Sequence, residues 1–316
     1  MGNSFYFGWE PVFMQWLQNA LGETGVKVMS VLSVLGEEYI IVAVFAFLYL
    51  AFDKQSGVYI GTTLMTALVA NPMIKNIFLR RRPYFDHPEV KCFKPVDRNA
   101  DIYDVSAQGF SFPSGHSTNT ATFYGAVSAR FKKRWIYITA VVISLFVGVL
   151  RVALGAHYPT DVFMSYAVGA AIIFGIGILQ RKVRRQWVVF LTLLVPAACG
   201  FIYCRSNDYF NGLGLMIGFF GGVLFERKFV NFSETRYIPQ AILRVGIGAG
   251  IFFGLNTLLK LPFSEEFLAS ATIGQYLLRT IRYAVVIFFL AGVYPKCFPL
   301  LDRIFPDKAK RSGKEQ

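Results

Sequence analysis

The sequence has few of the residues that hold metals or form disulfides. Its 316 residues include only four cysteines and three histidines, and 32 Lys and Arg outnumber 19 Asp and Glu. The cysteines show neither a CxxC pair nor a Cys/His spacing typical of zinc sites, which favours buried or idle thiols. A disulfide between Cys92 and Cys204 is the less favoured alternative. The four cysteines are Cys92, Cys199, Cys204 and Cys297.

The N-terminal region lacks the features of a secretory signal. No Lys or Arg precedes Lys27 and no continuous apolar stretch follows, so we expect no signal peptide. Residues 1–28 instead predict an amphipathic helix, either lying in the membrane interface or, equally, packed against the rest of the protein. Its apolar positions are Trp9, Val12, Phe13, Trp16, Leu17 and Leu21, and its polar positions are Glu10, Gln15, Gln18 and Asn19.

Linkers and charged residues are also scarce. No Pro/Gly/Ser-rich or low-complexity tract divides the chain. Charged residues make up 16% and hydrophobic residues 54%, with a mean hydropathy of +0.46, which argues against a soluble protein and predicts an all-α polytopic membrane helix bundle.

About nine segments have nearly the ~20 apolar residues that a spanning helix needs. They are residues 30–51, 57–75, 116–131, 135–152, 160–180, 187–204, 210–226, 241–259 and 277–295. The third and fourth are separated only by Lys132–Arg134 and should form a helical hairpin. We therefore expect an interfacial helix at 1–28, a membrane core at 29–182, additional transmembrane helices at 183–306 and a disordered tail at 307–316.

Basic residues in short loops predict the orientation, because such loops stay in the cytoplasm. With nine spans, the Lys and Arg of residues 132–134, 181–185, 227–228 and the tail all fall on one side. The opposite connections, CRSNDYFNG and LPFSEEF, carry one Arg and none. The N-terminus should lie outside, and the C-terminus should be cytoplasmic.

Glycines recur at every fourth position in two predicted spans. This spacing lets neighbouring helix backbones approach closely, so we interpret both rows as packing surfaces. The rows are Gly214, Gly218 and Gly222, and Gly246, Gly250 and Gly254.

One basic segment does not fit the charge pattern. Residues 75–98 hold seven Lys and Arg on the side predicted to be outer, where an anionic ligand would account for them. In KNIFLRRRP, Lys75 and Arg82 are seven residues apart, about 20° short of two helical turns, so they share a face if the helix continues that far. Pro83 marks the helix end. Alone, such a pair is more typical of a solvated membrane anchor.

The second cluster is PSGH, Pro113–His116, immediately before the third predicted span. A helix N-terminus has unpaired N–H groups and a partial positive charge, so it binds anions. Ser114 can add its hydroxyl, and Gly115 lets a ligand approach the backbone. The alternative is a Ser N-cap beside an unrelated His116.

The third cluster is RVALGAHYPTD, Arg151 to Asp161. Gly155 can end the fourth span, and Pro159 suits the first turn of the fifth, where its missing N–H costs nothing. Asp161 in that turn can reach back to His157 and hold one ring nitrogen while the other faces the site. The alternative is a capping Asp beside an interfacial His.

The three clusters are expected to meet at the outer membrane surface. Two of the three histidines join the three cations there, with no cluster of carboxylates. Because those cations would repel a divalent metal ion, the set predicts an oxyanion site without metal or cofactor. The neighbouring Arg80, Arg81 and His87 are interpreted as solvated, with attraction of anionic substrate as the alternative.

These motifs resemble those of the type 2 phosphatidic acid phosphatase (PAP2) family, which shares its site with vanadium haloperoxidases. The order K-x6-RP, PSGH, R-x5-H-x3-D matches over about residues 57–180. Leu150 stands where the family usually has Ser, which would remove one hydrogen bond to substrate. The resemblance implies a six-helix core within 29–182. Nine spans and an outside N-terminus also resemble the sphingosine-phosphate phosphatase and glucose-6-phosphatase branches, and Asp161 favours the lipid phosphatases.

The resemblance implies a role for each motif residue. His157 would attack phosphorus to give a phosphohistidine, with Asp161 orienting it, and His116 would act as general acid and then base. The residues implied to hold the phosphoryl oxygens are Lys75, Arg82, Ser114, Gly115 and Arg151. Phosphoryl transfer depends mainly on positioning and preorganised positive charge, which this set supplies.

We therefore expect an integral membrane phosphatase acting on a lipid phosphate or diphosphate at the outer side. Phosphatidate, phosphatidylglycerophosphate, undecaprenyl diphosphate and sphingoid phosphates all remain open as substrates. The alternatives are a soluble sugar phosphate as substrate, a vanadate haloperoxidase, or a noncatalytic lipid-binding or transport protein. The expected partners are the phosphorylated lipid and membrane lipids, with no nucleic acid.

Overall fold

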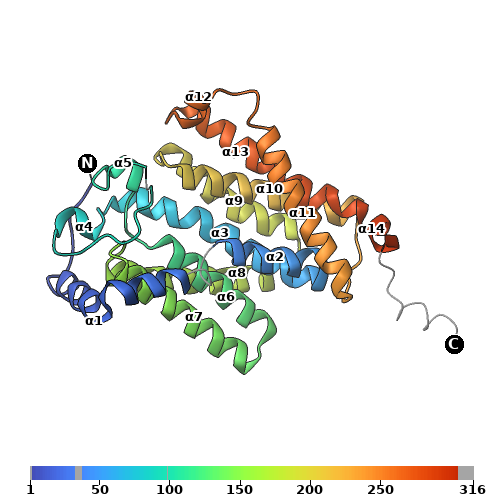
Figure 1. Ribbon diagram of the computed structural model, residues 1–316. Helices are drawn as coiled ribbons and strands as arrows, with labels where there is room; N and C mark the ends of the chain where they lie inside the picture. Colours follow the sequence, from blue (N-terminus) through green and yellow to red (C-terminus); the bar gives the residue numbers. More distant parts are fainter. Residues whose placement is uncertain (1, 33–37, 98, 305–316) are drawn as a thin grey trace. The chain divides into compact units, whose positions relative to one another are not determined.

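The computed structural model describes residues 2–32, 38–97 and 99–304, and every regular element within these ranges is helical (Figure 1). Asn3 and Arg80 form an isolated backbone bridge. The predicted all-α membrane bundle is confirmed. The expected tail at 307–316 lies outside the described residues.

Most elements follow one another along the chain with short connections, and a longer connection over residues 87–104 joins α4 to α5. The elements are α1 (Trp9–Leu32), α2 (Glu38–Phe47), η2 (Leu48–Phe52), α3 (Lys54–Phe78), α4 (Pro83–Asp86), α5 (Val105–Gln108), α6 (Gly115–Phe131), α7 (Arg134–Ala153), α8 (Pro159–Lys182), α9 (Gln186–Cys199), η3 (Gly200–Ile202), α10 (Asn207–Phe229), α11 (Ile238–Leu258), α12 (Glu265–Ala269), α13 (Ile273–Phe288), η4 (Phe289–Val293), η5 (Tyr294–Cys297) and α14 (Phe298–Ile304).

Six helical segments of the described chain are long and apolar enough to cross a membrane. They are Lys54–Phe78, Arg134–Ala153, Pro159–Lys182, Asn207–Phe229, Ile238–Leu258 and Ile273–Ile304. The other three predicted spans coincide with shorter helices: α2 with η2, α6 with 17 residues, and α9 with η3. At 1.5 Å per residue, α6 reaches only about 25 Å, less than the ~30 Å hydrocarbon layer. The total of nine spans stays a prediction.

The chain forms two compact units, each built from several stretches of sequence. The first comprises Met1–Ile41, Thr66–Arg181 and Cys199–Tyr209, and the second comprises Val42–Met65, Lys182–Ala198 and Phe210–Gln316. All the motif residues identified above lie in the first unit.

The predicted hairpin in the first unit is confirmed. Helices α6 and α7 (green in Figure 1) pack against each other, and the turn between them is two residues long. Lys132 ends α6 in the left-handed conformation (φ 52°), and Lys133 is the extended N-cap of α7. The hairpin brings the N-terminus of α6 and the C-terminus of α7 to the same end of the unit.

Helix α1 buries Glu10, Met14 and Gln18 against the rest of the first unit and leaves aromatic side chains exposed, together with Gln15 and Asn19. Glu10 is fully buried and Gln18 nearly so, whereas Trp16 is 61% exposed. The Gln18 Nε2 amide donates to the Lys91 carbonyl (2.8 Å) and the Ala153 carbonyl (3.0 Å). The helix therefore packs on the rest of the first unit. Its position in a membrane interface stays a prediction.

The two glycine rows of the second unit have different surroundings. A Cβ on Gly214 would lie 2.4 Å from the Thr280 carbonyl oxygen, and one on Gly218 would lie 2.4 Å from that of Ala284, so α10 packs closely on α13 as predicted. Gly246, Gly250 and Gly254 have no described atom within 4 Å of such a Cβ. The packing prediction for this second row is wrong, because this side of α11 is exposed.

Candidate active site

Buried polar side chains tie together the helices that carry the motifs. From α3, the Asn71 Nδ2 amide donates to Thr118 Oγ1 (2.9 Å) and to the Pro113 carbonyl (3.3 Å) at the start of α6. From α8, the Ser165 hydroxyl donates to the Ser114 carbonyl (2.9 Å). These contacts fix the PSGH turn between the end of α3 and the beginning of α8.

The first motif does not continue as a helix. Helix α3 ends at Phe78, and Leu79 takes a left-handed conformation (φ 53°). Arg82 is extended (φ −73°, ψ 154°), as expected for a residue before proline. Lys75 and Arg82 therefore do not share one helix face, and each reaches the site by a different route.

Arg82 and Lys75 nevertheless lie at the same site. The buried Arg82 guanidinium donates to the Gln108 carbonyl (2.8 Å) and the Ala156 carbonyl (3.0 Å), which binds it to the loop before His157. Lys75 approaches the PSGH turn, because a Cβ on Gly115 would lie 3.9 Å from Lys75 Nζ. The Lys75 ammonium therefore lies within van der Waals reach of Gly115.

Ser114 caps helix α6. Its hydroxyl accepts a hydrogen bond from the Ser117 N–H (3.4 Å) and donates to the Ser117 hydroxyl (3.0 Å). The N-cap expected as an alternative is present. Because the hydroxyl proton is already used, Ser114 has to rotate before it can donate to a bound phosphate.

The loop between α7 and α8 presents His157. Gly155 (φ 73°) turns the chain after α7, and a Cβ there would lie 2.2 Å from the Lys91 carbonyl oxygen. Pro159 opens α8 as predicted, with Asp161 in its first turn. The His157 ring is 2% exposed.

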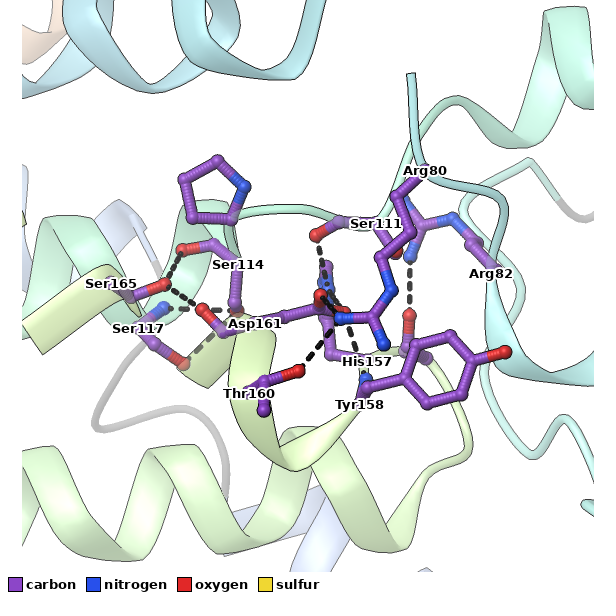
Figure 2. Close-up of polar contacts among 12 residues, drawn as sticks. Arg80, Arg82, Ser111, Ser114, Ser117, His157, Tyr158, Thr160, Asp161 and Ser165 are labelled. Atoms are coloured by element: carbon purple, nitrogen blue, oxygen red, sulfur yellow. Dashed lines mark hydrogen bonds and ion pairs between the residues drawn. The ribbon is translucent and has the colours of Figure 1, made fainter. Parts of the chain in front are cut away.

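The main-chain carbonyl of Ser111 lies closer to the His157 ring than Asp161 does. His157 Nδ1 lies 2.8 Å from the Ser111 oxygen, and Asp161 Oδ2 lies 3.5 Å from the same nitrogen (Figure 2). Since a carbonyl oxygen only accepts, Nδ1 carries the proton, and Nε2 of the neutral ring is the unprotonated nitrogen. The expected His157–Asp161 pair is present, and the shorter contact to Ser111 adds to it.

Asp161 is held mainly by Arg80. Asp161 Oδ1 accepts from Arg80 Nη1 at 2.6 Å, and Oδ2 accepts from the Tyr158 N–H at 2.8 Å (Figure 2). The Arg80 guanidinium stacks over the Tyr158 ring, 3.9 Å from its centroid. Arg80 is 1% exposed, so its interpretation as a solvated residue was wrong. His87 is also buried, whereas Arg81 is partly exposed and pairs with Asp86.

Helix α1 supplies the second carboxylate of this network. Glu10 Oε2 accepts from Arg80 Nη2 (2.9 Å), and Glu10 Oε1 accepts from the Thr160 N–H (3.1 Å) and hydroxyl (2.7 Å). Arg80 thus bridges two fully buried carboxylates. Arg80 therefore connects Glu10, near the N-terminus, to Asp161, whose carboxylate faces His157.

The two histidines share one cationic environment. Burial is the main cause that lowers the pKa of His157 well below 6.5, and the charges of Arg82 and Arg151 lower it further. His116 lies in the first turn of α6, outside the six long apolar segments. The charge of Arg151, then burial and the charges of Lys75 and Lys94, lower its pKa well below 6.5.

Lys75, Arg82, Arg151 and His116 all influence the His157 ring electrostatically, and Asp161 lies 3.5 Å from its Nδ1. The structure adds four residues that the motifs did not identify: Glu10, Arg80, Lys94 and Ser111. Lys94 belongs to the basic segment 75–98. The excess of positive charge in this segment is the sequence feature that could have identified Lys94. The Ser111 contact uses a main-chain oxygen, which leaves no signal in the sequence.

The fold is that of a polytopic helical membrane protein, and it brings the buried His157 and the half-buried His116 into one cationic environment. Residues 56–186 match the family model "PAP2 superfamily", and residues 210–304 match "PAP2 superfamily phosphatase, transmembrane extension". The chain belongs to the PAP2 superfamily, and the predicted resemblance is confirmed.

Several curated relatives are similar to part of the chain. A lipid A 1-phosphatase of Rhizobium etli is 32% identical over 154 residues, which cover 48% of this chain and 55% of the relative. A phosphatidylglycerophosphatase B of Bacillus subtilis is 36% identical over 26% of this chain and 44% of its own length. An undecaprenyl-diphosphatase of Bacillus subtilis is 31% identical over 47% and 72%, respectively.

The chain spans about half the length of the first relatives it matches. No solved structure matches the chain.

Proposed function

We propose that this protein is a membrane phosphatase that hydrolyses a lipid phosphate or diphosphate through a phosphohistidine at His157. The observation that carries the proposal is the 2.8 Å contact between His157 Nδ1 and the Ser111 oxygen. It leaves Nε2 unprotonated in a buried site near Arg82, Arg151 and Lys75.

In the first step, His157 Nε2 attacks phosphorus in line with the leaving oxygen. The P–N bond forms as the P–O bond breaks, and His116 gives its proton to the departing alkoxide or phosphate. The resulting imidazolium keeps its Nδ1 proton, which the Ser111 carbonyl and the Asp161 carboxylate stabilise. Asp161 therefore acts by positioning and electrostatics.

In the second step, His116 takes a proton from water, and the hydroxide attacks the phosphohistidine. The P–N bond breaks, inorganic phosphate forms, and both histidines return to their starting states. His116 thus acts first as acid and then as base, and neither step requires another reactant.

The phosphoryl oxygens are held by Lys75, Arg82, Arg151 and the N-terminus of α6 at Gly115, with Ser114 as a further donor after rotation. These cations are held in position before substrate binds. Arg82, for example, is held by two hydrogen bonds to carbonyl groups. Preorganised positive charge stabilises the equatorial oxygens of the transition state without reorganisation.

The lipid character of the substrate is supported by the relatives and the fold. The names of the three relatives refer to lipid A, phosphatidylglycerophosphate and undecaprenyl diphosphate, which share a phosphate on a lipid. Six spanning-length helices would keep the acyl or isoprenoid chain in the bilayer while the headgroup enters the cationic site. In the predicted topology this site faces the non-cytoplasmic side.

A substrate panel tests the proposal with purified protein in detergent. We expect phosphate release from at least one of phosphatidate, phosphatidylglycerophosphate, undecaprenyl diphosphate and sphingosine phosphate, and much less from glucose 6-phosphate. Excess EDTA should leave the rate unchanged, because cations of the chain itself neutralise the phosphate. A chelator-sensitive rate would contradict the metal-free mechanism, and release from the sugar phosphate alone would contradict the lipid assignment.

The pH dependence should respond to Lys94. A protonated His116 is needed for the first step, so kcat/KM falls as the pH rises through the pKa of His116. Since Lys94 lowers that pKa, Lys94→Gln raises it and should move the alkaline limb to higher pH. The measurement is kcat/KM on one substrate between about pH 4 and 9, so that substrate titration cancels between variants.

Lys91→Gln is the matched control for Lys94→Gln, because Lys91 is exposed and pairs with Glu23 at 3.1 Å. Its alkaline limb should coincide with that of the wild type. A flat profile in the wild type, or an equal shift in both variants, would contradict the role assigned to His116.

A further inference from the structure

The second unit contains a cavity of about 320 Å³ where α11, α12 and α13 meet. Its volume lies at the lower end of the range for small-molecule sites, large enough for a headgroup and too small for a lipid chain. Its wall combines basic, acidic and apolar side chains: Lys260, Glu265, Leu268, Ala269, Arg279, Arg282 and Tyr283.

Two of the basic residues belong to one face of α13. Gln275, Arg279 and Arg282 follow one another at spacings of four and three residues, which places them on the same side of the helix. This helix begins the spanning-length segment Ile273–Ile304. Arginine within a membrane span is costly and usually faces a functional site or a partner.

Arg282 is the most deeply placed of these cations. It is 4% exposed, and its Nε has no hydrogen-bond partner among the described residues. Its guanidinium lies 5.2 Å from the centroid of the Tyr283 ring, a contact that leaves its N–H groups available. A buried guanidinium of this kind needs an acceptor.

Another buried arginine of the same unit shows what a paired guanidinium looks like, although its Nε, like that of Arg282, has no hydrogen-bond partner among the described residues. Arg244 binds both carboxylate oxygens of Asp302, at 3.0 and 2.8 Å, and donates to the carbonyls of Leu50 and Ser233. Arg282 has no such carboxylate among the described residues, although Glu265 lines the same cavity. The acceptor for Arg282 is therefore expected to come from outside the chain.

The charge in the cavity also favours an anion. Three cations face a single carboxylate. Burial, then the charges of Arg282 and Arg279, lower the pKa of Lys260, so the three cations repel one another. The positive-inside rule does not account for them, because the predicted topology places the connection after α11 on the outer side.

We propose that the cavity lined by Lys260, Arg279 and Arg282 binds a phosphate group, carried by a membrane-lipid headgroup or free in solution. A tetrahedral phosphate offers several acceptor oxygens to guanidinium and ammonium donors from different directions. The site lies within the second unit and uses no residue assigned to catalysis. It therefore stands whether or not the protein is a phosphatase.

Two probes on the full-length protein in detergent micelles test this site. Phosphatidylglycerol, a phosphodiester with no monoester to hydrolyse, is counted by native mass spectrometry against phosphatidylcholine, and inorganic phosphate is titrated by thermal shift. Arg282→Gln should weaken binding of one or both probes by about tenfold, the effect of losing a charge-assisted hydrogen bond. Arg236→Gln, which changes an exposed arginine of the same unit, should leave both affinities unchanged.

The pattern of losses identifies the source of the phosphate. Weaker binding of phosphatidylglycerol alone assigns the site to a lipid headgroup, and weaker binding of inorganic phosphate assigns it to the free ion. Unchanged affinity for both probes would overturn the proposal. If Arg282→Gln does not fold, Lys260→Gln, at an exposed position, should weaken binding roughly threefold, and unchanged affinity there would equally overturn it.

Discussion

Replacing His157 with alanine is expected to lower phosphate release by a factor of roughly 10⁴ or more, because the proposed covalent intermediate forms on this ring. The ring is buried and oriented by the Ser111 carbonyl, so neighbouring side chains cannot take its place. The measurement is phosphate release from the best substrate of the panel, together with trapping of a ³²P-labelled protein after acid-free quenching. The variant should give no labelled protein.

Replacing His116 with alanine distinguishes the proposed roles of the two histidines. With a lipid phosphate the variant should lose roughly 10²–10⁴ in rate, because the leaving alkoxide then lacks its proton donor. With p-nitrophenyl phosphate, whose leaving group needs no proton, labelled protein should form and accumulate. Labelled protein in His157→Ala, or its absence in both variants on every substrate, would contradict the proposed order of events.

Replacing Arg80 with glutamine is expected to lower the free energy of unfolding by about 3–5 kcal/mol. Arg80 is the partner of both Glu10 and Asp161, and all three side chains are almost completely buried. Without the guanidinium, two carboxylates remain in a site where desolvation is not compensated. The midpoint of denaturant unfolding in a fixed detergent measures the loss.

Two further variants show whether the loss comes from this network. Arg81→Gln is the matched control, since Arg81 is the next residue and its partly exposed side chain pairs with Asp86. It should shift the midpoint only slightly. Adding Glu10→Gln to Arg80→Gln should restore part of the stability, because it removes one uncompensated charge. Equal losses in Arg80→Gln and Arg81→Gln, or no recovery in the double variant, would contradict the bridge.

The three motifs were predictable because they are defined by residue type and local spacing. Pro159, Asp161 and His157 lie within five residues of one another, so helix-start rules place them together before any tertiary contact is known. The hairpin between α6 and α7 was predictable for the same reason. In each case the relevant distances are set by a single turn.

The Arg80 network was not predictable, since its partners are distant in sequence. Glu10 lies 70 residues before Arg80 and Asp161 lies 81 residues after it. Before folding, Arg80 and Arg81 are equivalent neighbours in a basic run. Only the left-handed turn at Leu79 and the extended chain that follows it decide which of the two points inward.

The glycine rows show the same limit in another form. Both rows have the same spacing, and only one of them meets another helix. Spacing describes the shape of one surface and carries no information about what lies opposite. A cavity beside Arg279 and Arg282 could not be predicted from the sequence for a related reason. It is formed only when α12 folds over the start of α13.

The position of Glu10 has a practical consequence for anyone who trims this protein. The family match begins at residue 56, and a construction that keeps only the matched region would discard helix α1. Arg80 would then retain one carboxylate and face the gap left by the other, while Thr160 would lose both of its contacts to Glu10. The boundary of the family match therefore separates Glu10 from Arg80 and Asp161, and a shortened chain that keeps this network intact has to include helix α1.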